Sequence, residues 1–302
     1  MKFQENKVVR AFWFLVEIYK AMTARNIGLL AAGVAFFALL ALFPGIAAFI
    51  SVFGFFADPL MLQDQLALVE DLLPPAAFTL LSNQITRLVW ANDGILGWTS
   101  LLSIFIALFL ARRGVDAMLI GICAIHDTPR RSGFAHAVRV AFITLGMLVV
   151  GVVALLAVLI LPVILAFFPI AGAQSYMIDA GRWALALGLV ALWIAVFYWI
   201  GPNRKPKAAQ IWKPGLILAL VLWISVSAGF SYYLGNFGNY NEIYGSIGAV
   251  IALLMWFYIS AYAVLLGGVL NATLEKRQES DEALNAPELV DKSDGTGQRE
   301  TE

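Results

Sequence analysis

The residues best able to do chemistry are arginines that follow two of the apolar segments. They are Arg112, Arg113, Arg130, Arg131 and Arg204. Guanidinium groups hold phosphate and carboxylate through paired hydrogen bonds, so these positions could bind an anion or a lipid headgroup on the cytoplasmic side. Two alternative interpretations stay open, and both are favoured over the binding of an anion. Asp116 could pair with the first two arginines along one helix, and the others could reflect only the excess of basic residues in cytoplasmic loops.

A second candidate site is the polar, glycine-rich segment 235–248, which joins the last two apolar segments. Irregular backbone at membrane depth is tolerated only where protein or a water-filled cavity covers it. This segment, together with a kink expected at a proline in the first apolar segment, could therefore line a substrate cavity. A tight turn in an interfacial belt of aromatic residues is the alternative. The candidate cavity residues are Pro44, Asn236, Asn239, Tyr240, Asn241 and Tyr244.

Residues for hydrolytic or metal chemistry are scarce. The chain has two histidines, His126 and His136, and one cysteine, Cys123. Metal sites and activated nucleophiles need clusters of such groups, so we expect no catalytic, metal or cofactor residue, and both imidazoles to be solvated in a loop. The 20 basic and 20 acidic residues cancel, which gives no electrostatic argument for nucleic acid. The sequence therefore predicts a protein that is not an enzyme and has no cofactor.

The elements that position these residues are apolar helices. Hydrophobic residues make up 61% of the chain and charged residues 13%, against about 45–50% and about 25% in soluble domains. A spanning helix needs about 20 mostly apolar residues. The pattern predicts an all-α polytopic membrane protein with about six transmembrane helices and no ionisable residue deep in any of them. The predicted spans are 27–57, 95–111, 138–168, 182–201, 214–235 and 244–272.

The basic residues predict the orientation of these spans. Of the twenty lysines and arginines, only Arg87 and Arg182 fall on one predicted side of the membrane. Since basic loops stay in the cytoplasm, both termini are predicted to be cytoplasmic, in a multi-pass protein of the bacterial inner membrane.

The segments around the spans also carry patterns. Residues 1–26 contain an amphipathic helix that lies either on the membrane surface or against the bundle. The exported loop 58–94 suggests two short helices split by a proline pair. The transmembrane domain is predicted to cover 27–273, and the acidic segment 274–302 is predicted to be a disordered cytoplasmic tail.

Several motifs resemble one known group of proteins. They include the turn at 201–205, the Lys-Pro-Gly at 213–215, the aromatic, glycine and asparagine string at 237–250, and the segment 265–271. Together they are similar to the YihY/BrkB-type bacterial inner-membrane proteins. The resemblance implies a six-helix membrane fold, a suggested transport role and a former ribonuclease label, against which the scarcity of histidines argues. Val269 stands where the group commonly has glutamate, so a function tied to that glutamate is not expected.

These observations favour a transporter or lipid-translocating permease. Its expected partners are the lipid bilayer and a phospholipid or small solute, with no nucleic acid. The alternative is a non-catalytic envelope scaffold that binds other proteins through the loop 58–94 or the tail. A membrane ribonuclease is the least favoured hypothesis.

Overall fold

The computed structural model describes residues 7–56, 93–166, 173–203, 214–236 and 241–285. Within these ranges every long element is an α-helix, which confirms the all-α prediction. The helices are α1 (Lys7–Ala24), α2 (Ile27–Phe56), α5 (Asp93–Ile125), α6 (Phe134–Ala166), α7 (Ala173–Ile200), α8 (Pro214–Asn236) and α9 (Asn241–Asn285).

Five of the helices in the described ranges are long and apolar enough to cross a membrane. Their apolar windows are Ile27–Ala48 in α2, Phe134–Val153 in α6, Trp183–Ile200 in α7, Pro214–Tyr233 in α8 and Gly248–Glu282 in α9. Each overlaps a predicted span. The remaining predicted span, 95–111, lies within α5, which is not among the five. The chain is therefore a polytopic helical protein, while six crossings and their orientation stay predictions.

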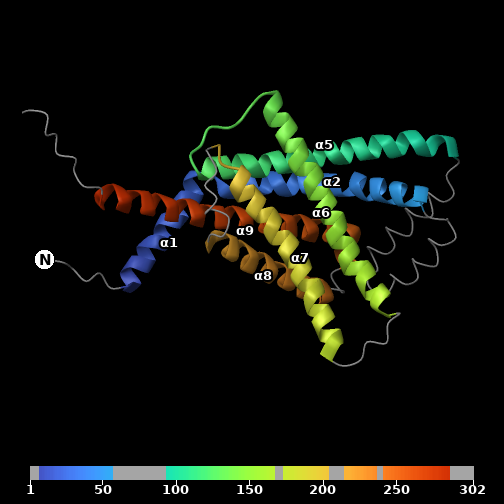
Figure 1. The fold of residues 1–302 in the computed structure, drawn as a ribbon. Coiled ribbons are helices and arrows are strands. Elements are labelled where there is room, and N and C mark those ends of the chain that lie inside the picture. Colours follow the sequence, from blue (N-terminus) through green and yellow to red (C-terminus); the bar gives the residue numbers. More distant parts are fainter. Residues whose placement is uncertain (1–6, 57–92, 167–172, 204–213, 237–240, 286–302) are drawn as a thin grey trace, which may run out of the picture.

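The helices form two sets in the bundle. In Figure 1, α2 and α5 run side by side, with α9 along α2 and α8 beside α9. The second set, α6 and α7, crosses them obliquely, and α1 crosses one end of α9. Apolar side chains such as Phe36, Phe105 and Phe142 are exposed on the outer faces of these helices. A bilayer would cover such surface, which a soluble protein would have to bury.

The buried core lies toward one end of the bundle. Its largest fully buried side chains are Ile27, Ile122, Ile125, Val140, Leu265 and Val269. Arg25, residues 126–133 and Lys276 lie at the same end, and we call it the basic end. There Asp127 accepts hydrogen bonds from Arg25 (2.8 Å) and Lys276 (2.6 Å).

The closest packing joins α7, α8 and α9 through small residues, and we call this contact the glycine junction. A Cβ atom on Gly267 would collide with Tyr198 and with the backbone of Gly215, and would lie 2.9 Å from Ala219. The polar groups here are paired. The Tyr198 hydroxyl donates to the carbonyl of Val264 (2.5 Å), and the Gly215 amide donates to Oδ1 of Asn271 (2.8 Å).

Helix α9 corrects the predicted start of the tail. The prediction placed disorder from residue 274, yet α9 continues to Asn285. The extension is anchored by Arg277, whose Nε and Nη2 atoms donate to Glu17 of α1 at 3.0 and 2.6 Å. A polar composition alone did not reveal this support, because the partner lies 260 positions away.

Helix α1 fits parts of both interpretations of the amphipathic segment. Ile18, Ala21 and Met22 pack against the core cluster. Phe12 and Trp13 are exposed, as are other large apolar residues of the same helix. The predicted helices in the loop 58–94 lie outside the described residues, apart from the first turn of α5.

Candidate anion-binding site

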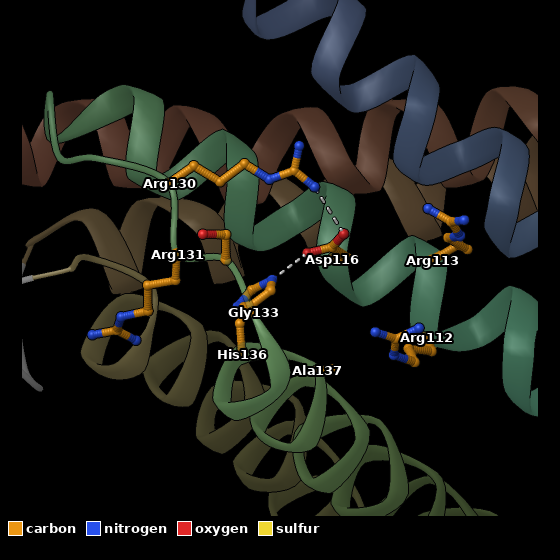
Figure 2. A pocket seen from close by; sticks show the side chains of 9 residues that line it. Arg112, Arg113, Asp116, Arg130, Arg131, Gly133, His136 and Ala137 are labelled. Carbon is orange, nitrogen blue, oxygen red and sulfur yellow. Dashed lines mark hydrogen bonds and ion pairs between the residues drawn. The ribbon is translucent and has the colours of Figure 1, made fainter.

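A cavity of about 560 Å³ lies between α5, the segment 126–133 and the first turn of α6. Figure 2 shows its side chains, with Arg130 of the segment and His136 of α6 directed at Asp116 of α5, and Arg131 pointing away from it. Four of the five arginines predicted to bind an anion line it, although they come from two separate stretches of sequence. The lining residues are Arg112, Arg113, Asp116, Arg130, Arg131, Ser132, Gly133, His136 and Ala137.

Asp116 is the acidic residue of this cavity, and its partners correct a prediction. Its Oδ1 accepts from Nε2 of His136 (2.8 Å) and its Oδ2 accepts from Arg130 (3.3 Å). The favoured pairing with the arginines one turn earlier on α5 is wrong, because the carboxylate faces the segment 126–133 and α6 instead. Its side chain is 16% exposed, and such shielding from water strengthens both interactions.

Arg131 mainly caps the C-terminal end of α7. Its guanidinium donates to the carbonyls of Ile200 (3.0 Å) and Pro202 (3.2 Å) and to Oδ1 of Asn203 (2.8 Å). The last carbonyls of a helix lack partners within it and carry partial negative charge, so a cation here stabilises α7. Partial burial lowers the pKa of Arg131. This side chain is therefore part of the scaffold of the cavity.

Arg112 and Arg113 differ from the other two arginines. Neither forms a hydrogen bond or ion pair with any residue that the structure describes. The one aromatic contact is that of Arg113, whose guanidinium carbon lies 5.3 Å from the ring centre of Phe109. Two cations thus line the cavity without an anionic partner in the described part of the chain.

These two arginines lie beside the middle of the apolar window of α2. The next residue, Gly114, packs against Phe37 and Ala38. Ala38 stands eleven residues after Ile27, or about 16 Å along the helix at about 1.5 Å per residue. The sequence predicted no ionisable residue deep in a span. That stays a prediction, since the two arginines follow the predicted span 95–111, and α5 continues past this span while still packed on α2.

The two histidines are not solvated, which corrects another prediction. The ring of His126 is 4% exposed, and its Nδ1 lies 3.0 Å from the carbonyl of Ile122. The ring of His136 is 15% exposed. Its Nδ1 is buried and has no hydrogen-bond partner among the described residues. His126 lies against α9, with its Nε2 4.0 Å from Glu275, and His136 lies against Asp116 of α5.

The other predicted site residues are not brought into this cavity by the described part of the chain. Pro44 lies inside α2, which continues through it, and does not line the arginine cavity. Asn236, Asn241 and Tyr244 lie in terminal turns of α8 and α9, and their side chains are outside the description. Asn239, Tyr240 and Arg204 lie outside the described residues, so the proposed second cavity stays a prediction.

An apolar groove of about 420 Å³ lies between α2, α5 and α6, and sequence reasoning missed it. Its walls include Val34 and Ala38 of α2, Val115 of α5, and Met147 and Leu148 of α6. A signal was present in the small residues of its lining, which leave room between helices. They are Ala38, Ala41, Ala111, Gly114 and Gly151.

The fold and the long apolar helices define a polytopic helical membrane protein. The sequence matches the family described as Virulence factor BrkB over residues 18–290, and the chain belongs to that family. This confirms the resemblance found in the motifs.

Relatives are found in Bacillus subtilis and in Xanthomonas species. The ribonuclease-like protein YfkH of Bacillus subtilis (strain 168) is 32% identical over 279 residues, which cover 88% of this chain and 96% of YfkH. A UPF0761 membrane protein of Xanthomonas campestris pv. campestris (strain B100) is 35% identical over 106 residues, which cover 35% of this chain and 25% of that relative. No solved structure matches the chain.

Proposed function

We propose that this protein is a lipid-translocating permease of the bacterial inner membrane, with its basic end in the cytoplasm. One observation carries the proposal. A cavity with four arginines and an apolar groove both lie between α5 and α6. A molecule with an anionic headgroup and a hydrocarbon chain has the two chemistries that these spaces offer.

The arrangement fits movement of a lipid better than that of a small hydrophilic solute. A polar pathway for a solute is lined by polar groups throughout, whereas the groove walls are almost wholly apolar apart from Thr144. In a membrane, ionisable residues at depth mark the path of a substrate or ion. Arg112 and Arg113 beside Ala38 would therefore meet a headgroup as it leaves the interface.

We propose no enzymatic step at this site, although a relative carries the name ribonuclease-like. In the arginine cavity Nε2 of His136 is held by Asp116, and Nδ1 has no exposed surface. A general base must reach the proton that it removes. Neither nitrogen can reach a phosphodiester in this arrangement.

A scaffold is the second candidate function, and α1 is the observation that favours it. Phe12, Trp13 and Leu15 form an exposed apolar surface next to the basic end. A partner protein could bind there, as could the membrane surface. Recovery of one stoichiometric partner that is lost in Trp13→Ser would favour the scaffold, and recovery of no such partner would count against it.

Translocation can be tested in liposomes. The purified full chain is reconstituted into phosphatidylcholine vesicles that contain a trace of headgroup-labelled phosphatidylglycerol, and dithionite then bleaches the label in the outer leaflet. A permease should raise the accessible fraction from about half toward completion. Arg112→Gln should slow this exchange, and Arg10→Gln, exposed on α1, should not. Exchange no faster than in empty vesicles, for any labelled phospholipid, would contradict the proposal.

A further inference from the structure

The charge balance of the arginine cavity restricts what it can bind. Arg130 is paired with Asp116, so these two charges offset each other. The guanidinium of Arg131 faces the terminal carbonyls of α7 and Oδ1 of Asn203. The remaining cations are Arg112 and Arg113, and among the described residues neither has an anionic partner. Because Arg131 contacts only neutral oxygens, three positive charges are left without an anion among the described residues, and two of them, on Arg112 and Arg113, also lack a hydrogen-bond partner there.

The position of these charges strengthens the binding of an anion that matches them. The guanidinium carbon of Arg113 lies 5.3 Å from the ring centre of Phe109, and Gly114, the next residue, packs against Phe37 and Ala38. Arg112 is half-buried and Arg113 is exposed, so an anion can reach both side chains. With apolar groups on one side, an anion that neutralised both arginines would be held more strongly there than at a fully hydrated surface.

The helix terminus at the cavity favours the same kind of ligand. Gly133 and Ala137, in and before the first turn of α6, line the cavity. The first amides of a helix lack partners within it and carry partial positive charge. Asp116 does not oppose an incoming anion at full strength, because both of its oxygens are occupied by His136 and Arg130.

We propose that the headgroup taken by this site is a phosphate monoester that carries two negative charges, as in a phosphatidic acid. This inference rests on the proposed function for the lipid part and adds the class of headgroup. A monoester carries about −1.5 to −2 charges at pH 7 and has three terminal oxygens, which can accept from two guanidinium groups. A phosphodiester headgroup carries one charge and leaves Arg112 or Arg113 unmatched.

The experiment compares two short-chain lipids that differ in this charge. The full chain in neutral detergent is titrated by calorimetry with dioctanoyl phosphatidic acid and with dioctanoyl phosphatidylglycerol at pH 7.5. Phosphatidic acid should bind at least about tenfold more tightly, which corresponds to about 1.4 kcal/mol. The preference should shrink when the pH falls below about 6, where the second ionisation of the monoester is lost.

Matched variants assign the preference to the two arginines. The double variant Arg112→Gln, Arg113→Gln should bind both lipids equally, whereas Arg112→Lys, Arg113→Lys and the single Arg10→Gln, on the exposed side of α1, should keep the preference. Equal affinities in the unchanged protein, or a preference that survives the double glutamine variant, would overturn the inference. Glycerol 3-phosphate serves as the chain-free probe. Binding as tight as that of phosphatidic acid would overturn the lipid part and assign the site to a free phosphate monoester.

The two proposals fail in different ways. If phosphatidic acid binds selectively while no labelled phospholipid crosses the vesicle membrane, the headgroup inference stands and the permease does not. If phospholipids cross without selective binding, the permease stands and the monoester does not.

Discussion

The glycine junction and the arginine cavity are both polar places inside a largely apolar bundle, and they differ in how their polar groups are matched. At the junction, Tyr198 donates to Val264 and Asn271 accepts from Gly215. In the cavity, Arg112 and Arg113 have no hydrogen-bond partner within the described ranges. A fully paired polar group supports the fold, whereas an unmatched charge in a space of about 560 Å³ indicates a ligand.

The glycine junction and the arginine cavity also differ in the space that they leave for side chains. At the junction a single added Cβ would strike neighbouring backbone. In the cavity the long arginine side chains leave open volume between α5 and α6. Substitutions at the junction should therefore change stability, and substitutions in the cavity should change binding with little effect on stability.

The largest effect is expected from Gly267→Leu. The new side chain has no space beside Gly215, Tyr198 and Ala219, so α8 and α9 must separate. The cost should exceed about 3 kcal/mol, the upper part of the usual range for overpacking. Thermal unfolding in detergent, monitored by size-exclusion chromatography, measures this loss of stability. Gly229→Leu on α8 is the control, because nothing lies within 4 Å of its added Cβ. Equal losses in both variants would remove the distinction between the two regions.

A smaller loss is expected from Tyr198→Phe. The change removes one buried hydrogen bond, to the carbonyl of Val264, and keeps the ring in place. A net hydrogen bond contributes about 0.5–1.5 kcal/mol. Unfolding of the two proteins under the same detergent conditions gives the difference, and lipid binding should stay unchanged. A loss of binding without a loss of stability would place Tyr198 with the cavity instead.

A pH-dependent effect is expected from Asp127→Asn at the basic end. Hydrogen bonds from Arg25 and then Lys276 lower the pKa of Asp127 below its usual 3.8. The stabilisation by ionised Asp127 is therefore complete above the pKa that this group has in the unfolded chain. It is lost as the pH falls through the lower pKa that the group has in the folded protein.

Because the side chain of Asp127 is 55% exposed, we expect less than about 1 kcal/mol. Asparagine tolerates the positive φ of 51° at this position. The gap in unfolding temperature between the two proteins should be constant from pH 6 to 8 and close toward pH 3. A gap that widened on acidification would contradict the assignment.

The smallest change in stability is expected from the double variant Arg112→Gln, Arg113→Gln. Removing two like charges that lack partners should leave the free energy of unfolding within about 0.5 kcal/mol, or raise it slightly. The unfolding temperature without added lipid measures this. A marked destabilisation would show that these arginines belong to the fold, as those of the basic end do.

Much of the fold could be predicted from sequence because hydrophobic periodicity and length are local properties. The starts of the helices at Ile27 and Pro214 follow directly from the change in composition there. The end of α9 did not, because its support comes from Glu17 at the other end of the chain. The position of Arg112 near the middle of α2 was also not predictable, because it depends on how α5 packs along α2.

The candidate site was only partly predictable for a related reason. Guanidinium chemistry indicated Arg112, Arg113, Arg130 and Arg131 as a group that could bind an anion, and the structure places them around one cavity. The different partners of these four arginines could not be predicted from their spacing in the sequence. Asp116 was expected to pair along its own helix, and only the fold of the segment 126–133 brings His136 and Arg130 to it.

The bonds of adjacent Arg130 and Arg131 limit how the cavity can widen. One residue ties the connecting segment to α5 through Asp116, and the next ties it to the end of α7 through Ile200 and Asn203. These contacts hold α5 and the end of α7 together at this point. A motion that keeps both contacts intact must move α6 away from α5, which breaks the hydrogen bond between His136 and Asp116.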